Sequence, residues 1–321
     1  MQKKYRSKGI TLFLLVAITA FLILSGCAPT MSGAVKDDSS LTGISAELAP
    51  TGDHTGPKLR VGVVNFKNKT PSKVLGIGEA AADILGTILQ KTKRFIIIPQ
   101  QDIASILEQQ SMGASGAINP ATAAKMGKIL GLNAIVTGAI TAYSEALEGQ
   151  DYLVYKKKKQ IARVTVDYRI VDTTTGIQIM ADSGQGVYEK KTGGLLGLGS
   201  KSSYDTDLRD GALRDALTKA MVNMLKQLES QSWSGRIASI KGRSVYLNAG
   251  KKTGLQVGNI LLVQDLGEEI IDPQTHVSLG RAPGRMKGEI MITGFFGSDG
   301  AIATIRSGAG FKINDLVKIK Q

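Results

Sequence analysis

The strongest hydrophobic feature of the chain is an apolar run close to its start. Lys3, Lys4, Arg6 and Lys8 come first, and residues 10–24 are then almost wholly apolar. A basic segment followed by a short apolar segment is typical of a secretory signal peptide, whereas a transmembrane helix needs about 20 apolar residues. The pattern therefore predicts a cleaved leader rather than a membrane-spanning anchor.

Between residues 58 and 230, short apolar segments of two kinds alternate. Runs rich in β-branched residues predict strands at 58–66, 94–99, 133–143, 162–172 and 177–189. Apolar positions at helical spacing predict helices at 77–90, 102–110, 120–130 and 208–228. The order predicts an α/β (α+β) sandwich over residues 58–230, with helices covering one face of a mixed sheet.

Two strands carry more detailed expectations. In the segment 162–172 an apolar residue stands at every second position, which predicts a sheet with one buried face. The segment "RFIIIP", residues 94–99, has apolar residues at consecutive positions and predicts a short buried strand that Pro99 ends.

The last part of the chain, residues 233–321, differs in composition and in the pattern of its apolar residues. It is rich in glycine, its apolar segments are short, and no helical period occurs, so it predicts a small all-β barrel domain. Two pairs of segments resemble each other: those that begin at Gly235 and Gly288, and those that begin at Gly254 and Gly310. An internal repeat of this kind favours two similar strand groups that pack into a closed barrel.

Residues 27–57 lack any sustained apolar period and contain many small and polar residues. This composition predicts a flexible tether between the leader and the folded part. His54 lies in it, away from any predicted framework that could position a catalytic group.

Cys27 is the only cysteine, and it stands where the apolar run ends. The segment Leu24-Ser25-Gly26-Cys27 resembles the lipobox of bacterial lipoproteins. The resemblance implies that residues 1–26 are a lipoprotein signal peptide and that Cys27 becomes the acylated first residue. Ala28, in place of an aspartate, favours the periplasmic face of the outer membrane. Acylation would also leave no thiol for a disulfide, a nucleophile or a metal ligand.

The charge of the chain narrows its partners. Removing the four basic residues of the leader lowers the formal net charge from +13 to +9. A basic surface suggests nucleic acid or anionic lipid, but export argues against nucleic acid, and aromatic residues are only 5% of the chain. Lipid of the outer membrane is therefore the expected partner, and no nucleic acid is expected.

Three segments resemble chemical sites but lack residues or positions that such sites need. Gly76–Ala81 has the loose spacing of a dinucleotide-binding loop, but it does not follow its strand directly, so a helix-entry turn is predicted. Gly193–Ser202 lacks the glycines that a phosphate-binding loop needs. His276 has Asp272 nearby but no second histidine or thiol. The sequence thus predicts no cofactor, no metal site and no enzyme activity.

Four consecutive lysines, Lys156, Lys157, Lys158 and Lys159, form the densest charge in the chain. The simplest interpretation is a solvated hairpin end. The alternative is contact with anionic headgroups, to which each lysine near the surface would add ~1 kcal/mol.

From Lys58 to Glu229 the order of segments resembles the curli-secretion lipoprotein (CsgG) family. The matching segments are "RVGVVNF", "RFIIIPQQDIASIL", "LNAIVTGAIT" and "VTVDYRIVDTTTGIQIMADS". The tail, "GRIASIKGRSVYLNAGKKTGLQVGNILLV", resembles the C-terminal barrel of flagellar assembly protein T. The resemblance implies an outer-membrane lipoprotein that acts in export or assembly of surface structures, often as a ring-shaped homo-oligomer.

Channel-forming members of that family insert two hairpins per subunit into the membrane. The corresponding segments here are 143–160, whose 18 residues leave no turn between two spanning strands, and 184–208, where apolar residues are sparse. We therefore expect self-association through the α/β domain with a short polar hairpin at the membrane surface. The alternative is a monomeric periplasmic adaptor or regulator that binds a partner enzyme or the cell wall.

Overall fold

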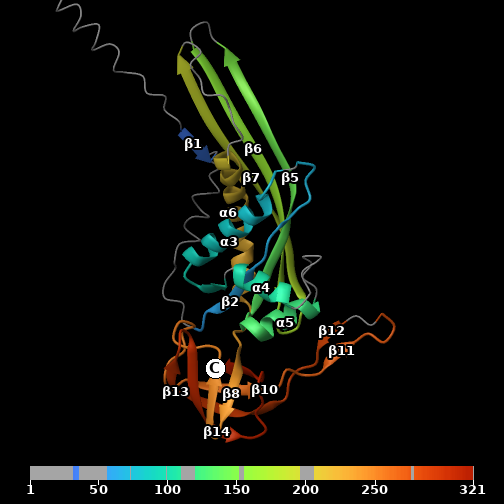
Figure 1. The fold of residues 1–321 in the computed structure, drawn as a ribbon, viewed down its shortest axis with the longest axis vertical. Helices are drawn as coiled ribbons and strands as arrows, with labels where there is room; N and C mark the ends of the chain where they lie inside the picture. The colour runs from blue at the N-terminus through green and yellow to red at the C-terminus, as the bar shows by residue number, and fades with distance from the viewer. Residues whose placement is uncertain are drawn as a thin grey trace, which may run out of the picture.

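The protein has three parts along its long axis: a β-ribbon at one end, an α/β sandwich in the middle and a barrel at the other end (Figure 1). The structure is a computed structural model. It describes residues 32–35, 56–72, 74–98, 100–109, 120–151, 155–195, 206–275 and 278–320.

A mixed sheet runs through the sandwich and the ribbon. Its strands are β1 (Ser32–Val35), β2 (Leu59–Val63), β3 (Lys67–Asn68), β4 (Phe95–Ile98), β5 (Ala134–Asp151), β6 (Tyr155–Asp172) and β7 (Gln178–Leu195). Their spatial order is β1-β7-β6-β5-β2-β4, with β3 beside β5. β2 is parallel to β4 and β5, whereas β5, β6, β7 and β1 are antiparallel in succession. The predicted mixed sheet is confirmed.

Helices cover both faces of this sheet, so the expectation that they cover only one face is wrong. They are α3 (Ile77–Lys91), α4 (Gln100–Gln109), α5 (Pro120–Leu130) and α6 (Thr206–Glu229), each within two residues of its predicted bounds. α3 and α6 pack with the strands into the main core on one face, whereas α4 and α5 pack on the other, where Ile103 of α4 and Met126 of α5 belong to a smaller cluster with Val171. The remaining length of β5–β7 forms the ribbon.

β6 shows why the alternating pattern was informative. Ala162, Val164, Val166, Tyr168 and Ile170 are each at most 2% exposed and all belong to the main core. The residues between them, such as Arg163 and Arg169, are exposed. Side chains alternate between faces along a strand, so one face of β6 is buried as predicted.

α6 lies unusually close to β7 because glycines meet at their interface. A Cβ atom added to Gly184 would lie 2.4 Å from the carbonyl oxygen of Ala216, and one added to Gly186 would lie 2.1 Å from that of Ala212. The backbone N–H of Val187 donates a 2.8 Å hydrogen bond to the carboxylate of Asp215 on α6. The helix is thus fastened directly to the backbone of the strand.

Three strands are longer than the sequence predicted. The expected ends at residues 143, 162 and 189 become Asp151, Tyr155 and Leu195, and the ladder continues to the pairs Asp151–Lys156 and Tyr155–Leu195. Residues 143–151, 155–160 and 184–195 therefore continue the sheet, and the expected strand ends at 143, 162 and 189 are wrong. Apolar alternation stops at residue 143 because the core stops there, but backbone hydrogen bonding does not require burial.

β4 also differs from its prediction. It is the outermost strand of the sheet rather than a buried one, and only Phe95 is buried, whereas Ile96, Ile97 and Ile98 are partly exposed. A continuous apolar run is typical of a central strand in a parallel sheet, which explains the error.

The C-terminal part is a closed six-stranded antiparallel barrel, as predicted. Its strands are β8 (Gly235–Lys241), β9 (Ser244–Leu247), β10 (Ile260–Gln264), β13 (Met286–Phe296), β14 (Gly300–Gly308) and β15 (Leu316–Ile319), in the spatial order β10-β13-β14-β9-β8-β15. β11 (Glu269–Ile271) and β12 (Ser278–Arg281) form a separate two-stranded sheet.

The internal repeat appears in the structure as two matching turns before β10 and β15. Gly254 and Gly310 open the turns with φ angles of 100° and 73°. Asn259 then accepts a 2.8 Å hydrogen bond from the N–H of Gln256, and Asp315 accepts one of 2.7 Å from Lys312. The two strands that follow are paired with each other, so the barrel has approximate two-fold symmetry.

Polar contacts join the barrel to the sandwich. Nη1 of Arg60 donates to the carbonyl oxygen of Asn248 at 2.7 Å, and the amide of Asn133 donates to that of Ser234 at 2.7 Å. The N–H of Lys58 donates to the carbonyl oxygen of Thr253, also at 2.7 Å. The two parts are therefore held in a defined arrangement.

The close approach of α6 to β7 predicts a specific sensitivity. Changing Gly184 to Ala should destabilise the protein by about 1–3 kcal/mol, because the added methyl must displace α6. The matched control is Gly294→Ala in β13, where an added Cβ meets nothing within 4 Å. Urea unfolding should show the loss for Gly184→Ala alone, and equal stabilities would contradict the packing argument.

The barrel closes on itself, and we expect residues 233–321 to fold without the rest of the chain. The isolated fragment should show a cooperative thermal transition by circular dichroism. A random-coil spectrum would show instead that the contacts of Arg60 and Asn133 with the barrel are required for its folding.

Candidate functional site: the free end of the ribbon

The short strand β1 fixes the direction in which the N-terminal segment leaves the fold. It pairs antiparallel with the outer edge of β7, from Ser32 opposite Lys191 to Val35 opposite Tyr188. β7 runs toward the free end of the ribbon at Leu195, so the chain that precedes Ser32 leaves β1 toward that same end. Cys27 lies outside the described residues, but five residues can span at most about 18 Å.

The lysine run begins at the same end. Lys156 is opposite Asp151, next to the connection between β5 and β6, and Lys158 is opposite Thr192. Lys159 is level with the start of β1, because Ser32, Lys191, Lys159 and Glu148 form one row across four strands. The structure thus places the lysine run beside the exit of the N-terminal segment.

Lys159, the last lysine of the run, is not free to bind a headgroup, because its side chain forms ion pairs within the sheet. Nζ of Lys159 lies 3.0 Å from Oε1 of Glu189 and 3.8 Å from Oε2 of Glu148. These carboxylates compensate its charge. The side chains of Lys156, Lys157 and Lys158 lie outside the described residues, although their backbone belongs to β6. Any headgroup contact would therefore rest mainly on these three.

The segments that resemble chemical sites have structural roles where they are described. Gly76 has a φ of 70° and begins α3, and a Cβ on Gly78 would lie 1.8 Å from the carbonyl oxygen of Phe66. The predicted helix-entry turn is confirmed. Gly193 and Gly194 extend β7, while residues 196–205 lie outside the described part.

Titratable groups in the fold also act as structural ties. Burial raises the pKa of Tyr168, whose hydroxyl donates to the carboxylate of Asp182 at 3.3 Å and to the carbonyl of Ala220 at 3.2 Å. The amide of Asn223 donates to Asp182 and, with the N–H of Ser183, lowers the pKa of that carboxyl group. This cluster connects β6, β7 and α6.

His276 lies outside the described residues, so its pairing with Asp272 has no structural test. The carboxylate of Asp272 accepts hydrogen bonds from the backbone N–H groups of Thr275 and Gln274, which lower its pKa. Within the described ranges, no group of three or more His, Cys, Asp or Glu side chains is arranged to hold a metal ion.

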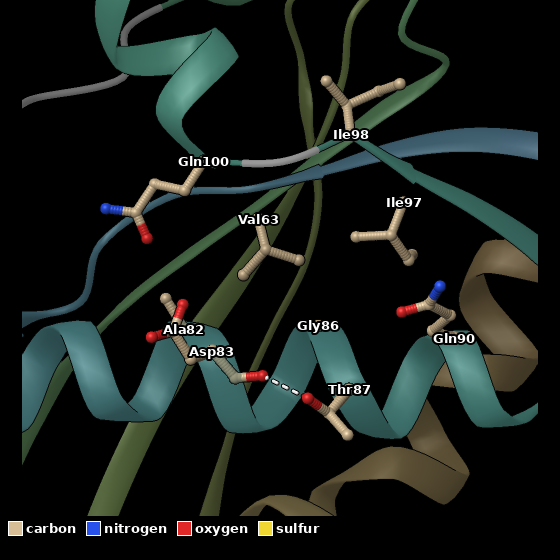
Figure 2. Close-up of a pocket in the computed structure, with 9 residues that line it drawn as sticks. All are labelled: Val63, Ala82, Asp83, Gly86, Thr87, Gln90, Ile97, Ile98 and Gln100. Carbon is tan, nitrogen blue, oxygen red and sulfur yellow. Dashed lines mark hydrogen bonds between the residues drawn. The ribbon is translucent and has the colours of Figure 1, made fainter.

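A hollow of about 270 Å³ that no sequence pattern predicts lies between α3 and the edge of the sheet. Figure 2 shows Val63, Ala82 and Ile97 facing it, with the amides of Gln90 and Gln100 toward its two ends. The alternation of strands and helices gave no indication of it, since it depends on β4 lying at the sheet edge.

A family model describes most of this chain. The model for the curli production assembly/transport component CsgG matches residues 45–257. The chain belongs to the CsgG family. The match covers the sandwich, the ribbon and the beginning of the barrel, and it agrees with the family expected from the sequence.

Individual proteins that resemble this chain have low sequence identity to it. A Neisseria meningitidis serogroup B protein named as a lipoprotein (NMB1126/NMB1164) is 24% identical over 227 residues, which are 67% of this chain and 97% of that protein. The solved lipoprotein GNA1162 of Neisseria meningitidis has a TM-score of 0.33 and 18% identity, covering 52% of this chain and 98% of that one. The LpoB C-terminal domain of Salmonella enterica has a TM-score of 0.30 and 12% identity, covering 44% and 90% respectively. Neither structural likeness bears on function.

No helix in the described ranges combines the length and the apolar character needed to cross a membrane.

The lysine run gives a prediction for unacylated protein. In a Cys27→Ser background, changing Lys156, Lys157 and Lys158 to Glu should weaken binding to phosphatidylglycerol vesicles at low salt by at least ~100-fold, at ~1 kcal/mol per lysine. Vesicle sedimentation measures the effect.

The matched control changes Lys251, Lys252 and Lys312 to Glu. These residues are exposed on the barrel, and their reversal changes the net charge equally. An equal loss of binding in both variants would mean that total charge, rather than the ribbon end, governs attraction to the membrane.

Proposed function

We propose that the protein is a non-enzymatic outer-membrane lipoprotein, anchored through Cys27, that acts as a homo-oligomer in export or assembly of cell-surface structures. The observation that carries the proposal is the row formed by Ser32, Lys191 and Lys159, which brings the exit of the N-terminal segment to the lysine-bearing end of the ribbon.

The lipid anchor is supported by three independent features. The segment from Leu24 to Cys27 has the form of a lipobox, the family model is that of a curli assembly and transport component, and the Neisseria relative is named as a lipoprotein. An acylated Cys27, a few residues from β1, would hold the ribbon end against the membrane. Two or more acyl chains suffice for stable anchoring.

The shape then orients the whole molecule. The ribbon and the barrel lie at opposite ends of the long axis (Figure 1). With the ribbon end at the outer membrane, the barrel would extend away from it into the periplasm. The contacts of Arg60 and Asn133 with the barrel would keep it there.

The observed strand lengths remove one of two objections to a ribbon that spans the membrane. Strands of 18 residues exceed the ~9–11 residues that a spanning strand needs, so length is no objection. Composition still is, because a lysine near the midplane costs ~2–4 kcal/mol. We therefore expect the ribbon end to contact headgroups, with subunits associating through the α/β domain.

The second candidate, a monomeric periplasmic adaptor or regulator, uses the same anchor. It is favoured by the placement of the barrel, whose separate hairpin β11–β12 carries exposed apolar side chains that suit a partner. In that case a partner enzyme or the cell wall would take the place of a second subunit.

Replacing Cys27 with Ser tests the anchor. The variant should remain soluble or stay uncleaved at the inner membrane, because it cannot be acylated. Fractionation of the variant with the outer membrane would contradict the proposal.

Mass determination of the acylated protein in detergent, together with single-channel recording, tests the rest. An oligomer without large, stable conductance steps is the expected result. A strictly monomeric, non-conducting protein would favour the adaptor, and large steps from this chain alone would show that the ribbon spans the membrane.

A further inference from the structure

The hairpin formed by β11 and β12, which we call the arm, is covered only in part: β12 lies against α5, whereas apolar side chains of both strands stay exposed. It projects sideways from the barrel (Figure 1). Ile270 and Ile271 on β11 are 44% and 54% exposed, and Leu279 on β12 is 59% exposed. An isolated two-stranded hairpin is marginally stable in water, so exposed apolar side chains on one indicate that it is completed by another surface.

A second surface without a partner, an unpaired strand edge, lies at the edge of the sandwich. In the described part of the chain no strand pairs with the outer edge of β4, yet its residues are Phe95, Ile96, Ile97 and Ile98. Exposed sheet edges normally carry charges, prolines or bulges that prevent pairing with other chains. Pro99 follows the strand, but the strand itself has no such protection.

The hollow beside β4 makes this edge a groove. α3 forms one wall of it, and Val63 and Ile97 give it an apolar floor (Figure 2). A Cβ on Gly86 would meet only Ile97, at 3.8 Å, so space remains above the strand. We call the edge of β4 together with this hollow the groove. Its form suits an extended segment with apolar side chains, the arrangement in which a strand is added to a sheet.

The charges beside the two surfaces are complementary in part. β11 is the apolar centre of the segment Gly267–Pro273, in which Glu268 and Glu269 stand before Ile270 and are exposed. The groove begins after Lys91 and Lys93, which are also exposed. The carboxylate of Glu269 is itself 3.5 Å from the guanidinium of Arg281, and Asp83 also lines the groove. Glu268 and the two lysines therefore carry most of the match. The arm thus has the sequence character that the groove requires, namely apolar residues next to carboxylates.

The arm projects from the side of the molecule opposite to α3. Figure 1 shows the arm on one side of the long axis and α3, which lines the groove, on the other. We infer that the arm of one copy binds the groove of a neighbouring copy, with β11 lying along the free edge of β4.

This contact is heterologous, because it uses different surfaces on the two subunits. Repetition of such a contact gives a ring if the rotation closes. The inference rests on the oligomer proposed above and adds to it the surfaces that form it.

Another segment of the chain, β1, does not suit the groove of a neighbour. β1 starts level with Glu148, whereas β4 ends level with Ile135 near the start of β5. The separation is 13 residues of strand, or roughly 43 Å along the long axis. Copies standing side by side on one membrane would not bring these edges together.

Cross-linking in acylated, full-length protein in detergent tests the contact. Acylated Cys27 has no free thiol, so a variant carrying Ile271→Cys and Gln90→Cys has reactive thiols only on the arm and at the groove. A short bismaleimide should link these into a ladder of dimers, trimers and larger species on a denaturing gel. A 1:1 mixture of the two single variants should stop at dimers.

Matched variants distinguish a specific role of the arm in self-association from a general effect of added charge. Ile271→Glu should weaken self-association at least tenfold by light scattering, whereas Leu147→Glu on the ribbon, 58% exposed in the parent, should not. Reversing Glu268 and Glu269 to Lys should weaken association too, and reversing Lys91 and Lys93 to Glu in the same chain should restore it.

The outcomes distinguish this inference from the proposed function. If the parent protein is oligomeric but the ladder is absent, or if Ile271→Cys alone gives dimers through arm-to-arm contact, the inference is overturned and the anchored oligomer stands. A monomeric parent overturns both the inference and the oligomer. Maleimide reaction at Cys27 of the parent would instead show that the acylation is wrong.

Discussion

The antiparallel pairing of β1 with β7 is the constraint on which the orientation of the protein depends. A tether of 31 residues could otherwise leave an anchor anywhere around the fold, because flexible segments of this length reach tens of ångströms. Four paired positions, from Ser32–Lys191 to Val35–Tyr188, limit the free length before the ribbon to a few residues. A reversal of this strand would direct the N-terminus toward the barrel. In the function proposed here, the direction of one short strand thus determines which end of a long molecule would meet the membrane.

The pairing of β1 can fix this orientation only if β7 is itself held in place. Gly184 and Gly186 let α6 approach β7 closely, and Asp215 binds the N–H of Val187, beside the position where β1 ends. Tyr168 and Asp182 add a second connection among β6, β7 and α6. The ribbon therefore extends from a part of the sheet in which β6 and β7 are packed tightly against α6. The hydrogen bonds that Arg60 and Asn133 donate to the barrel fix its position relative to the sandwich.

Much of the fold follows from local pattern, and the errors have physical causes. Alternation at residues 162–170 located the buried face of β6, and the repeated glycines at 254 and 310 indicated the two halves of the barrel. The ends of β5, β6 and β7 were missed because ladder hydrogen bonds continue past the core, where side chains carry no apolar period. The position of β4 was missed because a run of consecutive apolar residues is typical of a central strand, whereas β4 lies at the sheet edge. The ion pairs of Lys159 depend on Glu148 and Glu189, which only the register of the three strands brings beside it.

The central claim is that the acylated protein stands with its ribbon end at the membrane and its barrel away from it. Energy transfer from a dye on the protein to acceptors in the lipid headgroups measures this directly. The dye would be placed on Glu148 in the ribbon or on Lys241 in the barrel, two exposed positions. The 18-residue length of β5 alone corresponds to about 60 Å. Transfer should therefore be efficient from position 148 and weak from position 241. Equal transfer from both positions, or stronger transfer from the barrel, would contradict the account.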